Sequence, residues 1–238
     1  MKNIKRIVVS TIILSFLFGG LGCSSTTKKE ENDAIKFKEE YEKLNDTIRE
    51  SDGAFYNNVS IDEKNPIQYI SAKEAVEIIK NKTGIIYFGA SWCPWCRNAI
   101  QVLFDVAQKK NIDVIYYVDM DKVRNIYEVK EGELVKTQKE QEGYYKLLEA
   151  LDSILGEETY TLTNDGKTYD TKEKRIYMPL IVGIKNGNIV ENHVGTVNLN
   201  SEQTKYSTLT KEQYNELYQV YDALLSKTFD NCIENKCS

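Results

Sequence analysis

The spacing of apolar residues divides the chain into expected strands and helices. Continuous apolar runs are typical of buried strands, and apolar residues that repeat every three or four positions predict amphipathic helices. The order of these segments predicts an α/β fold, a mixed sheet with helices on both faces. The predicted strands are 67–70, 85–88, 112–118, 180–184 and 189–194, and helical spacing occupies 72–79, 94–110 and 214–225.

Turn and capping residues mark the ends of several of these segments. Ser71 with Glu74 has the spacing of a capping box at a helix start, and Thr210 with Gln213 repeats it. Asn-Gly at 186–187, between two apolar runs, predicts a tight hairpin. These local signals agree with the element order.

Two segments lie outside this core pattern. Residues 23–64 are predicted as a tether followed by a peripheral helix, and residues 122–176 as an insertion of two hairpins and one helix. The compact domain is then expected over 65–230, with a cysteine-containing tail at 231–238. The stripe of the peripheral helix is Phe37, Tyr41, Leu44 and Ile48.

Residues 1–22 have the pattern of an export signal. Three basic residues precede an apolar run, 7–18, which is too short for a comfortable membrane span. Cys23 follows, an arrangement similar to bacterial lipoprotein signals, in which this thiol receives the lipid and becomes the mature amino terminus. Gly20 stands where such signals usually carry Leu. The alternative is an ordinary secretory signal that leaves Cys23 free.

The charge balance bears on the choice of partner. The chain has 31 basic and 36 acidic residues, a net charge of −5, and loss of the three basic residues of 1–22 moves this to −8. Such a surface argues against nucleic acid and against electrostatic binding to anionic lipid. A lipoprotein anchor carries two or three acyl chains, so the lipid on Cys23 is the expected membrane link. We therefore expect an extracytoplasmic protein that is lipid-anchored to the bacterial cell membrane.

Cys93 and Cys96 lie where a predicted strand turns into a helix. Cys93 would precede the helix, where free amide groups and the helix dipole stabilise a thiolate, and Cys96 lies one turn further on. Cys93 can then attack a disulfide, and Cys96 can resolve the mixed intermediate without a bound cofactor. Trp92 and Trp95 would limit exposure to the Cys93 edge. A purely structural disulfide is the alternative.

Cys232 and Cys237 follow the last predicted helix. Residues five apart on a helix cannot form a disulfide, so a bond between them implies a tail that has left the helix. We interpret this pair as a structural disulfide, with a second exchange pair as the alternative. A zinc site would need both of them together with Cys93 and Cys96, and no metal is expected.

Two stretches of the chain resemble the thioredoxin superfamily. The first is IYFGASWCPWC at 86–96, and the second is MPLIVGIKNG at 178–187, followed by Gly195. The resemblance implies a thioredoxin-like fold with an insertion before a cis-proline. It implies further that Pro179 lies beside the two cysteines and that the backbone of Met178 pairs with an extended substrate.

The resemblance covers about 65–121 and 177–228, and the chain departs from it at several positions. Tyr87 stands where thioredoxin carries a buried acid, and Met178 stands where it has Thr. The dipeptide between the cysteines is Pro-Trp rather than Gly-Pro, and the lone histidine, His193, lies outside the motif. A tethered Trp-Cys-Pro-x-Cys domain is also similar to bacteriocin-transport accessory proteins.

These observations predict a membrane-anchored thiol–disulfide oxidoreductase that is a monomer and uses no cofactor. Its expected partners are protein disulfides or dithiols and an unidentified redox partner. The insertion is expected to border the active face, so that deletion of 124–172 would change the substrate range. The competing hypothesis is a non-catalytic thioredoxin-fold binding or export-accessory module. The expected site consists of the nucleophile Cys93, the resolving thiol Cys96, and the substrate-positioning residues Pro179, Met178, Trp92 and Trp95.

Overall fold

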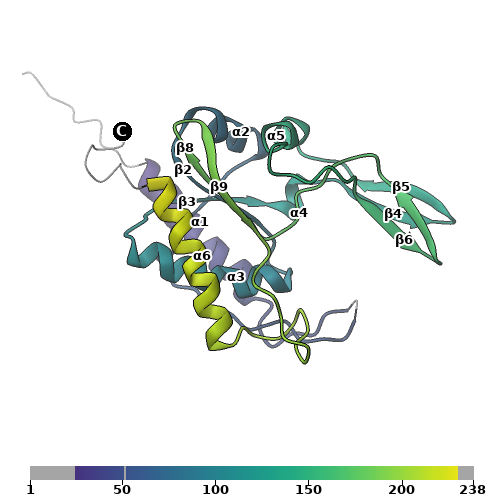
Figure 1. Cartoon of the computed structure of the whole chain (residues 1–238), viewed down its shortest axis with the longest axis horizontal. Coiled ribbons are helices and arrows are strands. Elements are labelled where there is room, and N and C mark those ends of the chain that lie inside the picture. Colours follow the sequence, from purple (N-terminus) through teal and green to yellow (C-terminus); the bar gives the residue numbers. More distant parts are fainter. Residues whose placement is uncertain (1–24, 51, 230–238) are drawn as a thin grey trace, which may run out of the picture.

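The computed structural model describes residues 25–50 and 52–229, which fold into the helices and strands of Figure 1. None of the helices in these residues is long and apolar enough to span a membrane. The helices are α1 (Ser25–Glu42), α2 (Ala72–Asn81), α3 (Pro94–Lys109), α4 (Met120–Val123), α5 (Tyr144–Ala150) and α6 (Lys211–Phe229). The strands are β1 (Ile67–Tyr69), β2 (Gly84–Gly89), β3 (Ile115–Asp119), β4 (Ile126–Lys130), β5 (Glu133–Gln138), β6 (Thr161–Asn164), β7 (Lys167–Asp170), β8 (Leu180–Lys185) and β9 (Asn188–Val194).

A five-stranded mixed sheet forms the centre of the molecule, with the strand order β1-β3-β2-β8-β9. β1, β3 and β2 run parallel, whereas β8 is antiparallel to β2 and β9 is antiparallel to β8. β2 is buried along its whole length because it lies between two strands and is covered on both faces. The predicted mixed sheet is therefore confirmed.

Successive side chains of β2 enter two different hydrophobic cores, as the alternation of a strand requires. Ile85 and Tyr87 pack with residues of α1, α3 and α6, whereas Ile86 and Phe88 pack with residues of α2 and α5. The helices therefore cover both faces of the sheet, as predicted.

The capping box and the tight turn predicted from the sequence both form at the expected positions. The Ser71 hydroxyl accepts from the Glu74 amide, and the Glu74 carboxylate accepts from the Ser71 amide, which completes the capping box of α2. In the β8–β9 turn, Asn186 and Gly187 have φ values of 51° and 74°. This left-handed conformation favours Asn and Gly, so the predicted hairpin is confirmed.

The helix predicted as a peripheral arm belongs to the core, and that prediction was wrong. α1 begins at Ser25, so its backbone is helical through much of the segment expected as a tether. Phe37 and Tyr41 are fully buried, and the Phe37 ring stacks on Tyr41 at 4.3 Å and meets Tyr117 edge-on at 4.9 Å. Ile48, expected on the same stripe, lies beyond the helix and is 56% exposed. The apolar stripe identified the buried side of the helix but not its partner, which is the β1–β3 end of the sheet.

Residues 126–170 form two hairpins and one helix outside the central sheet. β4 pairs with β5 and β6 pairs with β7, and these four strands extend together to the right in Figure 1 as the hairpin arm. α5 instead packs against α2. Its residues Tyr144, Leu147 and Leu148 are buried in the second core, the one that Ile86 and Phe88 enter. The segment predicted as an insertion thus contributes to the core as well as to the surface.

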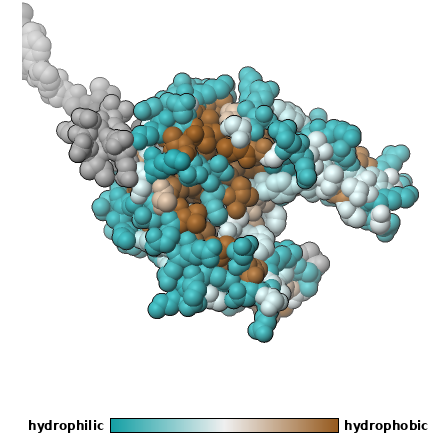
Figure 2. Space-filling view, viewed as in Figure 1, coloured by the Kyte–Doolittle hydropathy of each residue, from teal (hydrophilic) through white to brown (hydrophobic). Residues whose placement is uncertain are grey.

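The surface is hollowed beside the hairpin arm. Figure 2 shows a notch between this arm and the lower part of the molecule, and α4 lies at its inner end in Figure 1. The loop after α1 and the loop before α6 form the lower side, where the Tyr206 hydroxyl donates to Asp52. Groups at the base of the notch are therefore flanked by the arm and by these two loops.

Candidate active site

The turn from β2 into α3 positions the two cysteines. Cys93 is the N-cap of α3 and has an extended backbone, and Pro94 begins the helix, where its missing N–H leaves no donor unsatisfied. The Cys93 amide donates to the Ala90 carbonyl oxygen at 3.1 Å. Cys93 and Cys96 are free thiols, and Cys96 is fully buried whereas Cys93 is 4% exposed. The sequence predicted that exposure would be limited to the Cys93 edge, and only 4% of Cys93 is exposed.

The pKa of the Cys93 thiol is lowered from its ordinary value. The largest cause is hydrogen bonding from Cys96, and the amides of Trp95 and Cys96 and the charge of Arg124 act in the same direction, whereas burial opposes them. The amides act as dipoles directed at the sulfur, without forming a capping hydrogen bond to it. Cys93 is therefore the thiol that ionises first, as a nucleophile must.

The pKa of the Cys96 thiol is shifted the opposite way. Burial raises it well above its ordinary value, and the neighbouring Cys93 adds to this effect. The Ala90 amide and the Tyr87 hydroxyl oppose the shift, because hydrogen bonds to the sulfur favour the thiolate. When the pair ionises, the negative charge therefore forms first on Cys93, which suits attack by Cys93 and resolution by Cys96.

Two buried tyrosine hydroxyls continue from Cys96 into the core. The oxygens of Tyr87 and Tyr41 are 2.9 Å apart, and both side chains are fully buried. Gly89 makes room for the Tyr87 ring, because a Cβ at this position would lie 2.5 Å from it. Burial raises the pKa of both tyrosines, so their hydroxyls stay protonated and can donate hydrogen bonds. Tyr41 comes from α1, and no sequence pattern indicated that this helix lies near the resolving thiol.

The Met178–Pro179 loop lies beside the first cysteine. The peptide bond between these residues is cis, as the resemblance implies, and the Cys93 thiol donates to the Met178 carbonyl oxygen at 3.6 Å. The Gly195 amide donates to the Pro179 carbonyl oxygen at 2.8 Å, which joins the loop to the end of β9. The fold therefore brings the two quoted motifs into contact.

Trp92 is held by residues from two other segments of the chain. Its indole N–H donates to the Asp121 carboxylate of α4 at 2.5 Å, and Arg49 from the loop after α1 donates to its carbonyl oxygen at 3.1 Å. The guanidinium of Arg124 lies over its ring, 5.6 Å from the centroid. Trp92 and Trp95 are both half-buried and pack against the core that contains Cys93.

Two buried arginines near the cysteines were missed from the sequence. Arg97 is 1% exposed and Arg124 is 8% exposed. The side chain of Arg97 holds the segment after α1 against the start of α3, since all its hydrogen bonds are to residues outside α3. Its acceptors are the carbonyl oxygens of Asn57, Tyr41 and Ser91 and the side chain of Asn45. No local pattern indicated either residue, because Arg97 is followed by the polar Asn98 and Arg124 lies in the largely polar stretch 121–125.

Other predicted site residues lie elsewhere. Cys23, Cys232 and Cys237 fall outside the described residues. Within the described residues no group of three or more His, Cys, Asp or Glu side chains is placed to hold a metal ion, and the zinc alternative involves two cysteines beyond them. His193 is half-buried against the Tyr221 ring, and burial lowers its pKa.

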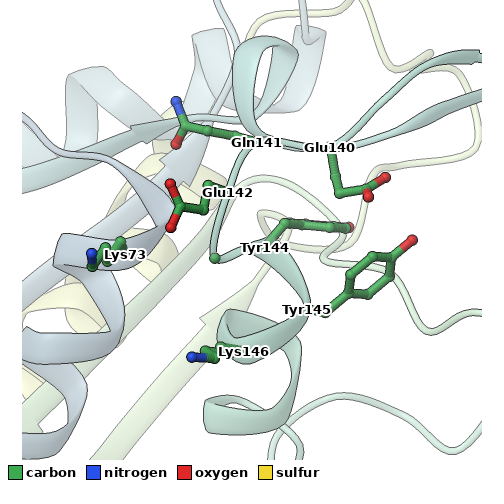
Figure 3. Close-up of a pocket in the computed structure, with 8 residues that line it drawn as sticks. Lys73, Glu140, Gln141, Glu142, Tyr144, Tyr145 and Lys146 are labelled. Carbon is green, nitrogen blue, oxygen red and sulfur yellow. The ribbon is translucent and has the colours of Figure 1, made fainter.

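A cavity of about 380 Å³ lies between the starts of α2 and α5 (Figure 3). Both signs of charge face it, with no cysteine or histidine, so it offers no nucleophile of its own. In Figure 3 the rings of Tyr144 and Tyr145 point away from Lys73 and Lys146. The lining residues are Lys73, Glu140, Gln141, Glu142, Gly143, Tyr144, Tyr145 and Lys146.

Comparison with known proteins adds little to this geometry. No protein-family model and no curated protein sequence matches the chain. Among solved structures, thioredoxin O2 from Arabidopsis thaliana in its oxidised state is similar, with a TM-score of 0.31 and 17% identity over 56% of this chain and 85% of that one. A likeness at this level is too weak to support an argument about function. The geometry of the site alone supports the functional conclusion.

Proposed function

We propose that the chain is a thiol–disulfide oxidoreductase of the thioredoxin type that acts on protein disulfides or dithiols. One observation carries this proposal: a thiol of lowered pKa stands at the start of α3, with a second thiol behind it and the Met178 carbonyl oxygen 3.6 Å away. A purely structural disulfide needs neither opposite pKa shifts of Cys93 and Cys96 nor the Met178–Pro179 loop beside the first sulfur. The arrangement suits stepwise exchange instead.

The reaction is a two-electron exchange that balances without a cofactor. The Cys93 thiolate attacks one sulfur of a substrate disulfide, a mixed disulfide forms, and the other substrate sulfur leaves as a thiolate that takes a proton from solvent. Cys96 loses its proton and attacks the Cys93 sulfur, which forms the 93–96 disulfide and releases the second substrate thiol. The substrate gains two electrons and the protein loses two. The reverse sequence oxidises a dithiol, and a separate redox partner restores the starting state.

The residues around Cys93 have supporting roles in this proposal. The backbone of Met178 pairs with an extended substrate segment, and Pro179 fixes the loop beside the sulfur. Trp92 and Trp95 border the site of attack. The half-buried side chain of Met178 packs against both cores, so the loop is held by the whole domain.

We also propose that the protein works as an extracytoplasmic monomer, anchored to the bacterial cell membrane by lipid on Cys23. The export pattern of 1–22 and the acidic charge balance support this placement. Outside the reducing cytosol Cys232 and Cys237 can form a structural disulfide.

Cys96→Ala tests the exchange mechanism directly. Because the resolving thiol is absent, Cys93 should remain bonded to client proteins as adducts that dithiothreitol releases. The matched control is the double variant Cys93→Ala/Cys96→Ala, which should trap none. Equal recovery of proteins with the single and the double variant would contradict the mechanism.

The low exposure of Cys93 favours one competing function. A sulfur that is 4% exposed is also compatible with a non-catalytic binding or export-accessory module. Such a module would bind its partner without a covalent adduct, so the trapping experiment separates the two functions. Reduction of a small generic disulfide by the native protein supports the oxidoreductase in the same way.

A further inference from the structure

Two buried polar atoms without a hydrogen-bond partner lie near one another in Arg124 and Tyr144. Among the described residues, the buried side-chain atoms without a hydrogen-bond partner are Arg124 Nε, Tyr144 Oη and Tyr221 Oη. The charges of Arg124 and Arg175 both act on the Tyr144 hydroxyl, which places the first two of these atoms near one another. Buried polar groups are normally hydrogen-bonded, so two such groups in one region make this region a candidate binding site.

The same place holds two positive charges side by side. Burial lowers the pKa of Arg124, and repulsion from the nearby Arg175 lowers it further. No ion pair joins either guanidinium to a carboxylate within residues 25–50 and 52–229. Asp121 faces Arg124, but it already accepts from the Trp92 indole. Neighbouring guanidinium groups repel one another unless an anion lies between them.

Aromatic rings hold both arginines in position. The Arg175 guanidinium stacks on the Tyr160 ring at 3.7 Å, and Arg124 lies over Trp92. Tyr144 approaches from α5, with its ring directed away from Lys73 in Figure 3. Burial raises the pKa of Tyr144 to about 12, so its hydroxyl remains a donor at neutral pH. The cluster therefore offers two guanidinium groups and a hydroxyl donor, with the carboxylates of Asp121 and Glu173 at its edge.

The cluster lies next to the reactive sulfur. Arg124 is near enough to Cys93 to favour its thiolate, and it covers Trp92, the residue before Cys93. Arg175 precedes Met178 by three residues, and the Met178 carbonyl oxygen accepts from the Cys93 thiol. A group held by the two arginines would therefore lie close to a disulfide that reacts at Cys93.

We propose that Arg124, Arg175 and Tyr144 bind a carboxylate of the substrate, so that the preferred substrates are peptide segments with an acidic group beside the exchanged cysteine. This inference rests on the proposed thiol–disulfide exchange. Guanidinium groups suit a carboxylate because they donate paired hydrogen bonds in its plane. On a protein whose net charge is −5, such a site selects acidic clients that the rest of the surface would repel.

Matched disulfide peptides test the inference with the full chain in its reduced form. Four peptides differ only in Glu or Gln beside the bridged cysteine and in a free or amidated carboxyl terminus. Because one charge-assisted hydrogen-bonded contact is gained, the native protein should react about tenfold faster with a carboxylate-bearing peptide. If the Glu and Gln peptides differ in rate, the preferred carboxylate is a side chain. If the free and amidated peptides differ, it is a chain terminus.

Variants assign the preference to the cluster. Arg175→Gln should bring the rate ratio close to one, and Arg175→Lys should retain part of it because the charge remains. The control Lys130→Gln removes a cation from the hairpin arm, where it pairs with Glu128, and should keep the full ratio. Each comparison is a ratio of the rates with two peptides for the same protein sample. A partial loss of folded protein lowers both rates equally and leaves the ratio unchanged.

Three results would overturn the inference. Equal rates with all four peptides would remove it and leave the exchange function intact. A preference that survives Arg175→Gln would assign the carboxylate to another site. No reaction with any peptide would remove the inference together with the proposed function.

Discussion

Tyr87 and Tyr41 give the resolving thiol surroundings that differ from those of thioredoxin. In thioredoxin a buried acid at this position serves proton transfer, whereas here a hydroxyl faces the Cys96 sulfur and a second hydroxyl supports the first. Both hydroxyls stay protonated because burial raises their pKa, so neither can accept the Cys96 proton as a base. Their contribution is to donate a hydrogen bond to the thiolate once it forms.

Tyr87→Phe should slow the resolving step. A hydrogen bond to a charged group contributes about 1.5–3 kcal/mol, so its loss raises the pKa of Cys96 and should slow resolution by about tenfold or more at neutral pH. The pH midpoint of the step should move upward, since more alkaline solution is then needed to form the thiolate. The measurement is release of a chromogenic thiol from a mixed disulfide preformed on Cys93.

Tyr221→Phe is the matched control for this experiment. Its hydroxyl is equally buried, lies in the same core as Cys96, and is one of the buried atoms without a partner among the described residues. Removal of an unpartnered hydroxyl should leave the rate and its pH midpoint unchanged. Equal slowing in both variants would assign the effect to packing instead of hydrogen bonding.

The sequence predicted those site residues that lie in short contiguous motifs. Cys93, Cys96 and Pro179 belong to stretches whose local pattern reports a strand end, a helix start or a turn. Arg124 and Tyr41 were missed because their importance depends on contacts across the fold. The Tyr41–Tyr87 hydrogen bond joins residues 46 positions apart, and no local pattern encodes such a pairing.

At the scale of elements, α1 is the main departure from the sequence analysis. Its apolar stripe was recognised, but a stripe does not say which surface covers it. In the structure the helix covers the β1–β3 end of the sheet, and the buried side chain of Arg97 joins α3 to the backbone at its carboxyl end. α1 therefore supports the start of α3, where Cys93 lies.

Phe37→Ala tests whether α1 is part of the folding unit. Truncation of a fully buried phenylalanine should lower the free energy of unfolding by about 3–5 kcal/mol, because apolar contacts are lost and a cavity remains. The matched control is Ile35→Ala on the same helix, where the side chain is 37% exposed and the change should stay within about 0.5 kcal/mol. Urea denaturation measures both free energies of unfolding. Equal changes in the two variants would indicate that α1 is peripheral to the folding unit.

The elements of the insertion have separate functions in the fold. The sequence indicated the two hairpins and α5, but it could not show that α5 packs against α2. Deletion of 124–172 would therefore expose the second core, because Tyr144, Leu147 and Leu148 would be removed from it. A test of substrate range must keep α5 and alter single residues, such as Arg175.

At the scale of the whole molecule, the notch and the start of α1 lie at different ends. The amino end of α1 and the carboxyl end of α6 lie at the left of Figure 1, whereas the notch opens on the right. Asp33, a buried residue of α1, follows Ser25 by eight residues, about 12 Å of helix. A lipid on Cys23 would thus hold the domain close to the membrane with its notch directed away from the anchor.

Cys23→Ser tests the proposed anchor. The native protein should partition into the detergent phase on phase separation, and its amino-terminal peptide should carry the added mass of the lipid. Without the thiol no lipid can attach, and since each buried CH₂ contributes about 0.8 kcal/mol, the variant should move almost completely to the aqueous phase. Cys237→Ser is the control and should remain with detergent. Reduction of a small soluble disulfide should be unchanged in Cys23→Ser, because Cys23 takes no part in the exchange, and a variant that still enters the detergent phase would exclude Cys23 as the anchor.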